Sequence, residues 1–286
     1  MSPFTWLIDR LPVRRRLGVD PLSDKSEPGA RFTPVPIHRL KVTGNLVIDI
    51  LARRQQTPPF TIDRGRRLAV IIPFRDREQH LAVLLGRLQV TLADQGIDYR
   101  IYVIEQAPGK VFSRARMINI GAQVVGDTAD YLCLHDVDMC PEFADYGCPS
   151  QPLRLIKRFS RTFRRTGDSL GYYFSGAIAI RRDQFQLVNG FDNGFWGFGS
   201  EDEDFFLRCL LAGLVPHEDQ LGVFSELDNP TAEQPYRTRR IRKGNKRLLI
   251  RQSYRRQIGR SGMSDLTYRL LDRREDGRII RVVVEP

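Results

Sequence analysis

The middle of the chain alternates between two kinds of apolar pattern. Short β-rich apolar runs predict buried strands over 67–74, 99–106 and 131–136. Apolar residues at helical spacing between these runs predict helices over 76–96 and 113–126. This alternation predicts an α/β fold, with a single doubly wound and mostly parallel sheet flanked by helices.

The second half of the chain is less regular. Its pattern predicts a strand over 172–180, a short helix over 182–190, and a Gly-rich aromatic loop that leads into a helix within 191–213. A terminal hairpin is predicted over 266–286, with its turn near Asp276. No internal repeat or low-complexity tract interrupts the pattern.

Length and composition fit one large domain with an appendage. The 286 residues, 41% of them hydrophobic, can bury a substantial core. Residues 1–64 are rich in Pro and Arg and predict an N-terminal extension, and 65–286 form the predicted main domain. No run approaches the length of a membrane-spanning helix, and the N-terminus lacks the apolar core of a secretory signal.

The cysteines lack the C-x-x-C spacing of a zinc site; they are Cys133, Cys140, Cys148 and Cys209. Their number also predicts no dense disulfide framework, which favours a reducing cytoplasm. A pairing of Cys140 with Cys148 across a loop stays open at this point.

Positive charge is concentrated in one segment. Residues 237–260 hold eleven of the 45 Lys and Arg residues and no acid, and the remaining 34 match the 34 Asp and Glu residues. Apolar residues interleave at roughly helical spacing, namely Ile241, Leu248, Leu249, Tyr254 and Ile258. They predict an amphipathic helix packed on the domain with its basic face outward. That face could be merely solvated, or could meet nucleic acid, anionic lipid or a phosphorylated substrate.

Charged residues follow two of the predicted strands. Ligands of such sheets bind outside the carboxyl ends of the strands, where Arg75, Arg77, Asp136 and Asp138 lie. Arginines there can hold a phosphate, and two aspartates one residue apart can converge on a hard cation such as Mg²⁺ or Mn²⁺. Two surface arginines and a strand-terminal turn capped by aspartates are the alternatives.

The Gly-rich loop combines backbone freedom with flat apolar side chains. Trp196 and Phe198 offer surfaces on which a sugar ring can stack, and the glycines around them allow the loop to move. The four acids of 201–204 open the following helix. Acids at a helix N-terminus are favourable to its dipole, but four in a row exceed that need, so one is a candidate general base.

Together these segments resemble the β-1,4-galactosyltransferase family. The resemblance runs from about residue 67 to the C-terminus and is carried, in order, by "IIPFRDREQHL", "FSRARMINIG", "LHDVDMCP", "YYFSGAIAI", "NGFDNGFWGFGSEDEDFFLR" and "GMSDLTYRLLD". It implies a GT-A fold and an inverting transferase that uses a UDP-sugar and Mn²⁺, with Mg²⁺ as a substitute.

The resemblance implies roles for individual residues at the donor site. The uridine diphosphate would be lined by Pro73, Phe74, Arg75 and Arg77, and its uracil flanked by Phe112 and Arg114. The ribose or sugar would lie near Asp136 and Val137. Tyr173 matches a position where tyrosine accompanies galactose rather than N-acetylgalactosamine. The mobile loop that closes over the donor would contain Trp196, Phe198 and Gly199.

The catalytic residues implied by the resemblance lie in the acidic run. Asp202 matches the catalytic base, and Glu201 is its acidic neighbour at the acceptor site. The implied mechanism is a single displacement at the anomeric carbon that forms a β-linkage to an acceptor glycan or glycolipid. Another UDP-sugar donor, such as UDP-GalNAc or UDP-glucose, and a non-catalytic nucleic-acid or glycan binder are the alternatives.

Two departures from the family pattern concern the loop and the metal. The family usually has tryptophan at the position of Phe198, so the resemblance does not identify the acceptor sugar. Asp138 is the implied metal ligand, and Glu226 and Asp228 stand where the family has histidines. Either both carboxylates join an all-oxygen site, or the metal relies on Asp138, diphosphate and water.

The expected cellular location follows from the N-terminal residues and from the basic segment 237–260. Met1 and the lack of a signal favour a cytoplasmic enzyme of bacterial type, with 237–260 in contact with the inner membrane surface. Nucleic acid is not an expected partner, because it would leave the acidic run and the loop unexplained.

Overall fold

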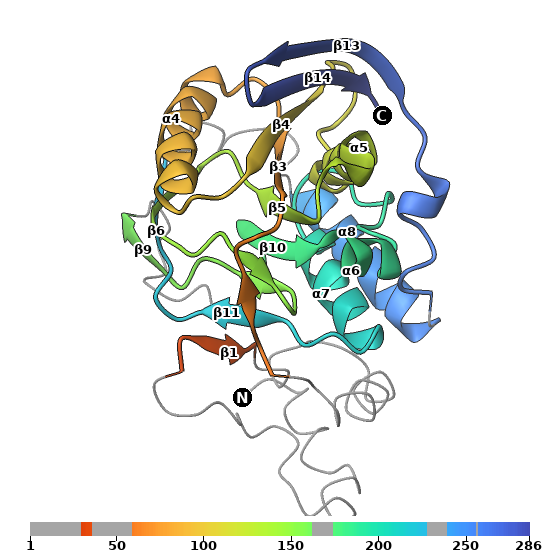
Figure 1. The fold of residues 1–286 in the computed structure, drawn as a ribbon. Coiled ribbons are helices and arrows are strands. Elements are labelled where there is room, and N and C mark those ends of the chain that lie inside the picture. The colour runs from red at the N-terminus through yellow and green to blue at the C-terminus, as the bar shows by residue number, and fades with distance from the viewer. Residues whose placement is uncertain (1–29, 36–58, 162–173, 228–238, 256) are drawn as a thin grey trace, which may run out of the picture.

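The computed structural model describes residues 30–35, 59–161, 174–227, 239–255 and 257–286. Its main feature is a mixed nine-stranded sheet (Figure 1). The strands of this sheet are, in chain order, β1 (Phe32–Pro34), β3 (Leu68–Phe74), β4 (Tyr99–Gln106), β5 (Tyr131–His135), β8 (Leu153–Arg154), β10 (Ala177–Arg181), β11 (His217–Asp219), β13 (Arg269–Asp276) and β14 (Ile279–Glu285). They are arranged in the order β1-β11-β8-β10-β5-β3-β4-β14-β13.

The centre of the sheet is parallel, and antiparallel pairs occur on both sides of it. In the register of the centre, Val70 of β3 lies opposite Ile101 of β4 and Cys133 of β5. β14 runs parallel to β4, whereas β10 is antiparallel to β5 and β13 to β14. The predicted doubly wound mixed sheet is therefore confirmed, and so is the terminal hairpin.

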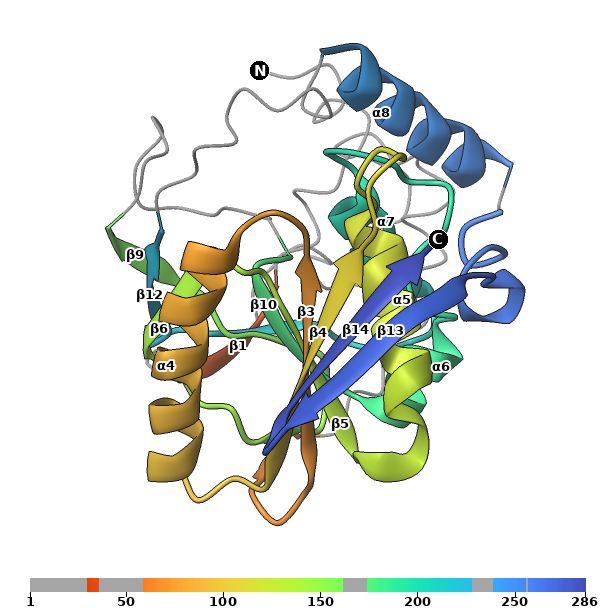
Figure 2. The same cartoon turned by 90° about the horizontal axis from the view of Figure 1, so that it is seen from above.

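Helices cover both faces of the sheet. The helices and short 3₁₀ turns are α4 (Glu78–Asp94), α5 (Arg114–Val125), η3 (Gly126–Thr128), α6 (Arg182–Leu187), α7 (Glu201–Leu211), α8 (Arg239–Tyr254) and η6 (Met263–Asp265). α4 lies on one face, and α5, α6 and α7 lie on the other (Figure 2). Successive residues of β3 point to opposite faces, so Ile71 joins the core under α5 and Ile72 the core under α4.

Two small sheets lie beside the main one. The first has the order β6-β12-β9 and the second pairs β2 with β7; their bounds are β2 (Ile62–Asp63), β6 (Met139–Phe143), β7 (Cys148–Pro149), β9 (Arg158–Arg161) and β12 (Val223–Glu226). β12 matters for the site because its register places Glu226 opposite Met139, the residue after Asp138. β1, from the predicted N-terminal extension, pairs with β11 and so joins the main sheet.

One predicted element is shorter than expected, because the strand predicted from residue 172 begins at Ala177 in the described residues. The following helix ends at Leu187, and the Gly190 amide donates to the Phe185 carbonyl at 2.9 Å, so Gly190 closes this helix as predicted. Gly190 has a positive φ of 60°, a conformation that glycine adopts without strain.

The basic amphipathic helix is confirmed as α8, with one error in its predicted inner face. Leu249 is buried and Leu248 and Ile241 are half-buried, but Tyr254 is 80% exposed. Tyr254 lies five residues after Leu249, about 140° around the helix, so the two cannot share a face.

The described residues bear on two further predictions. The four cysteines are all free and buried, so Cys140 and Cys148 do not pair. Within the described ranges, no helix has both the length and the apolar character needed to cross a membrane.

Candidate active site

The predicted site residues gather where β3 and β5 end and where α5 and α7 begin. A turn closes β5, in which the Met139 amide donates to the Asp136 carbonyl at 3.2 Å and the Asp136 amide donates to the Gly176 carbonyl at 2.7 Å. This turn fixes both aspartates of the D-x-D motif beyond the strand end. The hydrogen bonds of this turn are between backbone groups, and the two carboxylates accept from Arg114 and Arg77 instead of capping it.

Arg114 connects the D-x-D motif to the acidic run. Its Nε donates to Asp136 Oδ1 at 2.5 Å, and its Nη1 donates to Asp202 Oδ1 at 2.9 Å. The backbone of α5 holds this arginine in the first helical turn, where the Ser113 hydroxyl accepts a hydrogen bond from the Arg116 amide. The guanidinium therefore holds two carboxylates from distant parts of the chain in one cluster.

The first two acids of α7 are buried. Glu201 and Asp202 are 6% and 7% exposed. Burial raises the pKa of Asp202, and the Arg114 guanidinium opposes that rise. Burial also raises the pKa of Glu201, and the adjacent Asp202 carboxylate raises it further. Carboxyl groups with raised pKa values in one cluster are suited to proton transfer.

Arg77 and Asp138 form a second charged pair at the same edge. Arg77 Nη1 donates to Asp138 Oδ2 at 3.1 Å. Its Nε and Nη2 are buried, and no described residue accepts a hydrogen bond from them. Buried guanidinium donors that lack acceptors are costly, so they fit an anionic ligand such as a diphosphate.

Two carboxylates at this edge fit a hard divalent cation. Asp138 and Glu226 are 8% and 6% exposed, and their strands are tied by a hydrogen bond of 2.8 Å from the Leu227 amide to the Asp138 carbonyl. Oxygen ligands of this kind suit Mn²⁺ or Mg²⁺. Among the described residues no three acidic, His or Cys side chains gather closely enough to form a complete site, and Asp228 lies outside these residues.

The Gly-aromatic loop packs against the start of α5. The Ser113 hydroxyl donates to the Phe195 carbonyl at 2.8 Å, and the Gly197 amide donates to the Phe112 carbonyl at 2.8 Å. Gly197 has a φ of 70°, so the turn between the two aromatic residues favours glycine. Asn245 of α8 donates to the Trp196 carbonyl at 3.0 Å. The loop is thus held from two sides at its backbone.

Arg75 and Phe112 form an aromatic and cationic surface beside the loop. The guanidinium carbon of Arg75 lies 5.3 Å from the centre of the Phe112 ring, and Arg75 Nη1 donates to the Lys110 carbonyl at 2.8 Å. The cation beside the Phe112 ring is thus Arg75, whereas Arg114, the other residue expected to flank the uracil, donates to Asp136 and Asp202.

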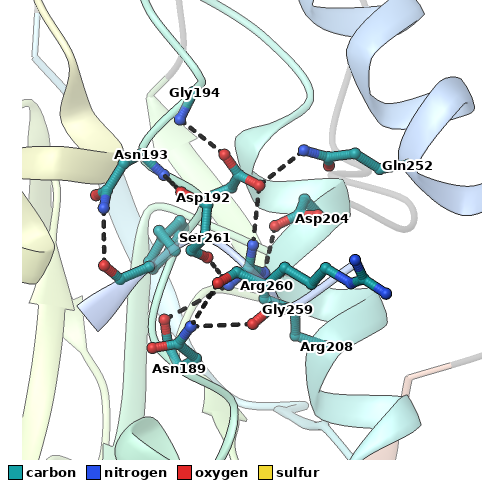
Figure 3. A network of polar contacts seen from close by, with 12 residues as sticks. Asn189, Asp192, Asn193, Gly194, Asp204, Arg208, Gln252, Gly259, Arg260 and Ser261 are labelled. Atoms are coloured by element: carbon teal, nitrogen blue, oxygen red, sulfur yellow. Dashed lines mark hydrogen bonds and ion pairs between the residues drawn. The ribbon is translucent and has the colours of Figure 1, made fainter. Parts of the chain in front are cut away.

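A buried polar network fixes the helix that carries Asp202 (Figure 3). Arg208 of α7 donates to Asp204 Oδ2 at 2.5 Å, to Asp192 Oδ2 at 3.1 Å and to the Ser261 carbonyl at 2.7 Å. Gln252 of α8 donates to Asp192 Oδ2 at 2.8 Å. The network therefore joins α7, the base of the Gly-aromatic loop, α8 and the segment after it.

Several of the predicted substrate-binding residues do not lie on an exposed surface of the site or lie outside the described residues. Phe74 and Val137 are 1% and 5% exposed and pack in the core beneath α4, and Pro73 is also buried. Gly199 donates its amide to Glu201 Oε2 at 3.1 Å. Tyr173 lies outside the described residues.

The sequence did not reveal three residues that shape the site. Asn245 holds the loop, Arg208 holds α7, and the guanidinium carbon of Arg116 lies 5.6 Å from the Trp196 ring centre. Asn245 carried a usable signal, because it is a polar residue one turn before Leu249 on the apolar stripe of the helix.

Comparisons with known proteins show the family to which the chain is similar. Residues 40–149 match the N-terminal region of glycosyl transferase group 7, and residues 157–220 match a family described as the N-terminal domain of galactosyltransferase. Human β-1,4-galactosyltransferase 1 is 31% identical over 84% of this chain and 62% of its own length. Rat β-1,4-galactosyltransferase 3 is 33% identical over 95% of this chain and 66% of its own length. The chain thus spans less than two thirds of the length of these curated animal relatives.

A solved structure shows the same fold. The catalytic domain of Drosophila β-1,4-galactosyltransferase 7 in complex with xylobiose matches with a TM-score of 0.64 and 27% identity, over 77% of this chain and 93% of that domain. A mutant of the fly protein, in complex with manganese, UDP-Gal and xylobiose, matches with the same TM-score and 26% identity.

Proposed function

Because the chain belongs to the β-1,4-galactosyltransferase family, we propose that it transfers galactose from UDP-galactose to a hydroxyl group of an acceptor sugar, with inversion. The observation that carries the proposal is the Arg114 guanidinium, which holds buried Asp202 beside Asp136 at the carboxyl edge of the sheet. The Arg114 guanidinium and the two carboxylates lie in one cluster, which supports a general base at Asp202 beside a nucleotide-binding Asp136.

The donor occupies the edge formed by the ends of β3 and β5. Arg77 donates hydrogen bonds from its buried Nε and Nη2 to the diphosphate, and Phe112 with Arg75 supports the uracil. Asp138 and Glu226 would hold Mn²⁺ or Mg²⁺. When bound there, the cation supplies positive charge that offsets the charge developing on the leaving UDP.

Asp202 acts as the general base. Its carboxylate accepts the proton of the acceptor hydroxyl, whose oxygen attacks the anomeric carbon on the face opposite UDP. The C–O bond to UDP breaks as the new bond forms, so an α-linked donor gives a β-linked product. Arg114 keeps Asp202 oriented, and the Trp196 loop excludes water from the donor.

Two measurements test this function. The wild-type chain should release UDP from UDP-galactose in the presence of Mn²⁺ and an acceptor sugar, in preference to UDP-GalNAc and UDP-glucose. Asp202→Asn should abolish transfer and leave UDP binding nearly unchanged. If Asp202→Asn retains transfer, then Asp202 is not the general base. If UDP with Mn²⁺ does not raise the midpoint of thermal unfolding of the wild-type chain, then the chain is not a transferase of this kind.

A further inference from the structure

Helix α8 has two faces with different functions. Its inner face consists of Asn245, Leu249 and Ser253, which are buried, and Asn245 contacts the Gly-aromatic loop. This face fixes the helix on the domain. The outer face is solvent-exposed, and the transfer reaction proposed above uses none of it.

The centre of the outer face is one stripe of four residues. Lys243, Arg247, Ile250 and Tyr254 follow the spacing i, i+4, i+7 and i+11, so their side chains lie above one another along the helix. All four are exposed, Ile250 by 52% and Tyr254 by 80%. The stripe is therefore basic in its first half and apolar in its second half.

Further cations border this stripe on both sides. All of them are exposed, and they are Arg239, Arg240, Lys246 and Arg251. The helix has no Asp or Glu to balance them. A cationic helix face with an exposed aliphatic residue and a tyrosine is typical of helices that lie in the headgroup region of an anionic bilayer. Tyrosine suits that region because its ring is apolar and its hydroxyl is polar.

We propose that the outer face of α8 is a docking surface for an anionic phospholipid membrane. The headgroup phosphates would pair with the Lys and Arg side chains, and Ile250 and Tyr254 would enter the boundary between headgroups and acyl chains. The exposed Ile250 favours a bilayer over nucleic acid, whose phosphates need only the cations. Like charge disfavours a second copy of the same helix.

The position of α8 gives this docking an orientation. Figure 2 shows α8 at the periphery, on the side toward which β3 and β4 point. The carboxyl ends of these strands carry the candidate active site, so docking would turn that side of the molecule toward the membrane. The contact between Asn245 and the Trp196 carbonyl places the docking helix directly beside the loop of the site.

The test is co-sedimentation of the full chain with lipid vesicles at near-physiological salt. The protein should bind vesicles that contain phosphatidylglycerol and should not bind vesicles of phosphatidylcholine alone. Triple reversal by Arg240→Glu, Lys243→Glu and Arg247→Glu should weaken binding to the anionic vesicles about a hundredfold or more. Ile250→Ser with Tyr254→Ser should weaken it on the order of tenfold while leaving the charge unchanged.

A matched control separates this helix from net charge. Arg269→Glu, Arg273→Glu and Arg274→Glu change the net charge equally on the exposed strand β13. Their effect should be far smaller than that of the α8 reversal, with circular dichroism showing that both variants fold. Equal loss in the two triple variants would overturn the proposal, and so would binding to neutral vesicles as tight as to anionic ones. Tighter binding to an RNA oligonucleotide than to anionic vesicles would overturn it in favour of nucleic acid.

Discussion

Asn245 of α8 donates a hydrogen bond of 3.0 Å to the backbone carbonyl of Trp196 in the Gly-aromatic loop. A second, longer bond of 3.4 Å reaches the Phe198 carbonyl. Asn245 is buried, so the two bonds satisfy an amide that would otherwise lack partners. The contact means that the loop's conformation depends on a helix that lies almost fifty residues later in the chain.

The first prediction concerns this contact. Asn245→Ala should free the loop backbone, raise the KM for UDP-galactose several-fold, and lower the free energy of unfolding by about 1–2 kcal/mol. Steady-state kinetics and thermal unfolding measure the two effects. Ser253→Ala is the control, because Ser253 lies on the same buried face and its hydroxyl donates to the Leu249 carbonyl one turn earlier. It should cost stability without changing the KM, and an equal KM change in both variants would mean that Asn245 only stabilises the helix.

The second prediction concerns the pH dependence of transfer. The Arg114 guanidinium lowers the pKa of Asp202 against the effect of burial. Arg114→Gln removes that cation, so the pKa of Asp202 should rise and the base should become ionised only at higher pH. The acidic limb of the kcat/KM profile should therefore move to higher pH, with activity partly recovered in alkaline buffer. Arg116→Gln, whose arginine lies over Trp196 rather than between the carboxylates, should leave the position of that limb unchanged.

A third prediction follows from the buried acids at the start of α7. Burial raises the pKa of Glu201, so the folded protein holds this proton at pH values where the unfolded chain has lost it. The stabilisation from this group is complete below its unfolded pKa and is lost as the pH rises through the folded pKa. Glu201→Gln should therefore raise the free energy of unfolding at neutral pH by on the order of 1 kcal/mol. At about pH 4 the variant and the wild type should be equally stable.

Thermal unfolding across this pH range measures the effect of Glu201→Gln. Glu203→Gln is its control, since Glu203 lies in the same helical turn but is only half-buried. A stability gain for Glu201→Gln that does not depend on pH would contradict the ionisation argument.

The apolar pattern was sufficient to predict the frame of the site. Strands at β3 and β5 follow from buried β-rich runs, and the ends of parallel strands must share an edge, so Arg77 and Asp138 were expected to lie close together. The ion pair between them confirms that expectation. In this part of the chain, the apolar periodicity and the rule that parallel strands end at the same edge were enough to predict which residues meet.

The contacts that complete the site depend on tertiary packing. Arg114 and Asp202 are 88 residues apart in sequence, and nothing in the local pattern of either segment requires them to meet. The error at Tyr254 comes from the local pattern itself. Tyr254 was predicted on the inner face of the helix from an approximate helical spacing, but its position around the helix points it away from the core. The resemblance supplied roles for Glu201 and Asp202, but the contact of the Arg114 guanidinium with Asp202 and Asp136 is seen only in the folded structure.

A fourth prediction concerns the diphosphate. Arg77 has two buried donors that no described residue accepts, and charge-assisted hydrogen bonds to a phosphate would satisfy them. Arg77→Gln should weaken UDP binding by about tenfold to a hundredfold. Isothermal titration calorimetry with UDP and with uridine gives an internal control, because uridine lacks the phosphates. Equal losses for the two ligands would place Arg77 away from the diphosphate.

The fifth prediction concerns the metal. Glu226 at the end of β12 and Asp138 just before the neighbouring strand β6 are buried carboxylates, and we expect both to bind the cation. Glu226→Gln keeps the size of the side chain and removes its charge, so the Mn²⁺ concentration that gives half of the UDP-dependent thermal stabilisation should rise about tenfold or more. Glu142→Gln, at the exposed end of β6 in the same small sheet, is the control and should leave the titration unchanged. If Glu226→Gln leaves the Mn²⁺ titration where it is in the wild type, then the metal relies on Asp138, the diphosphate and water, and Glu226 serves only the packing of β12.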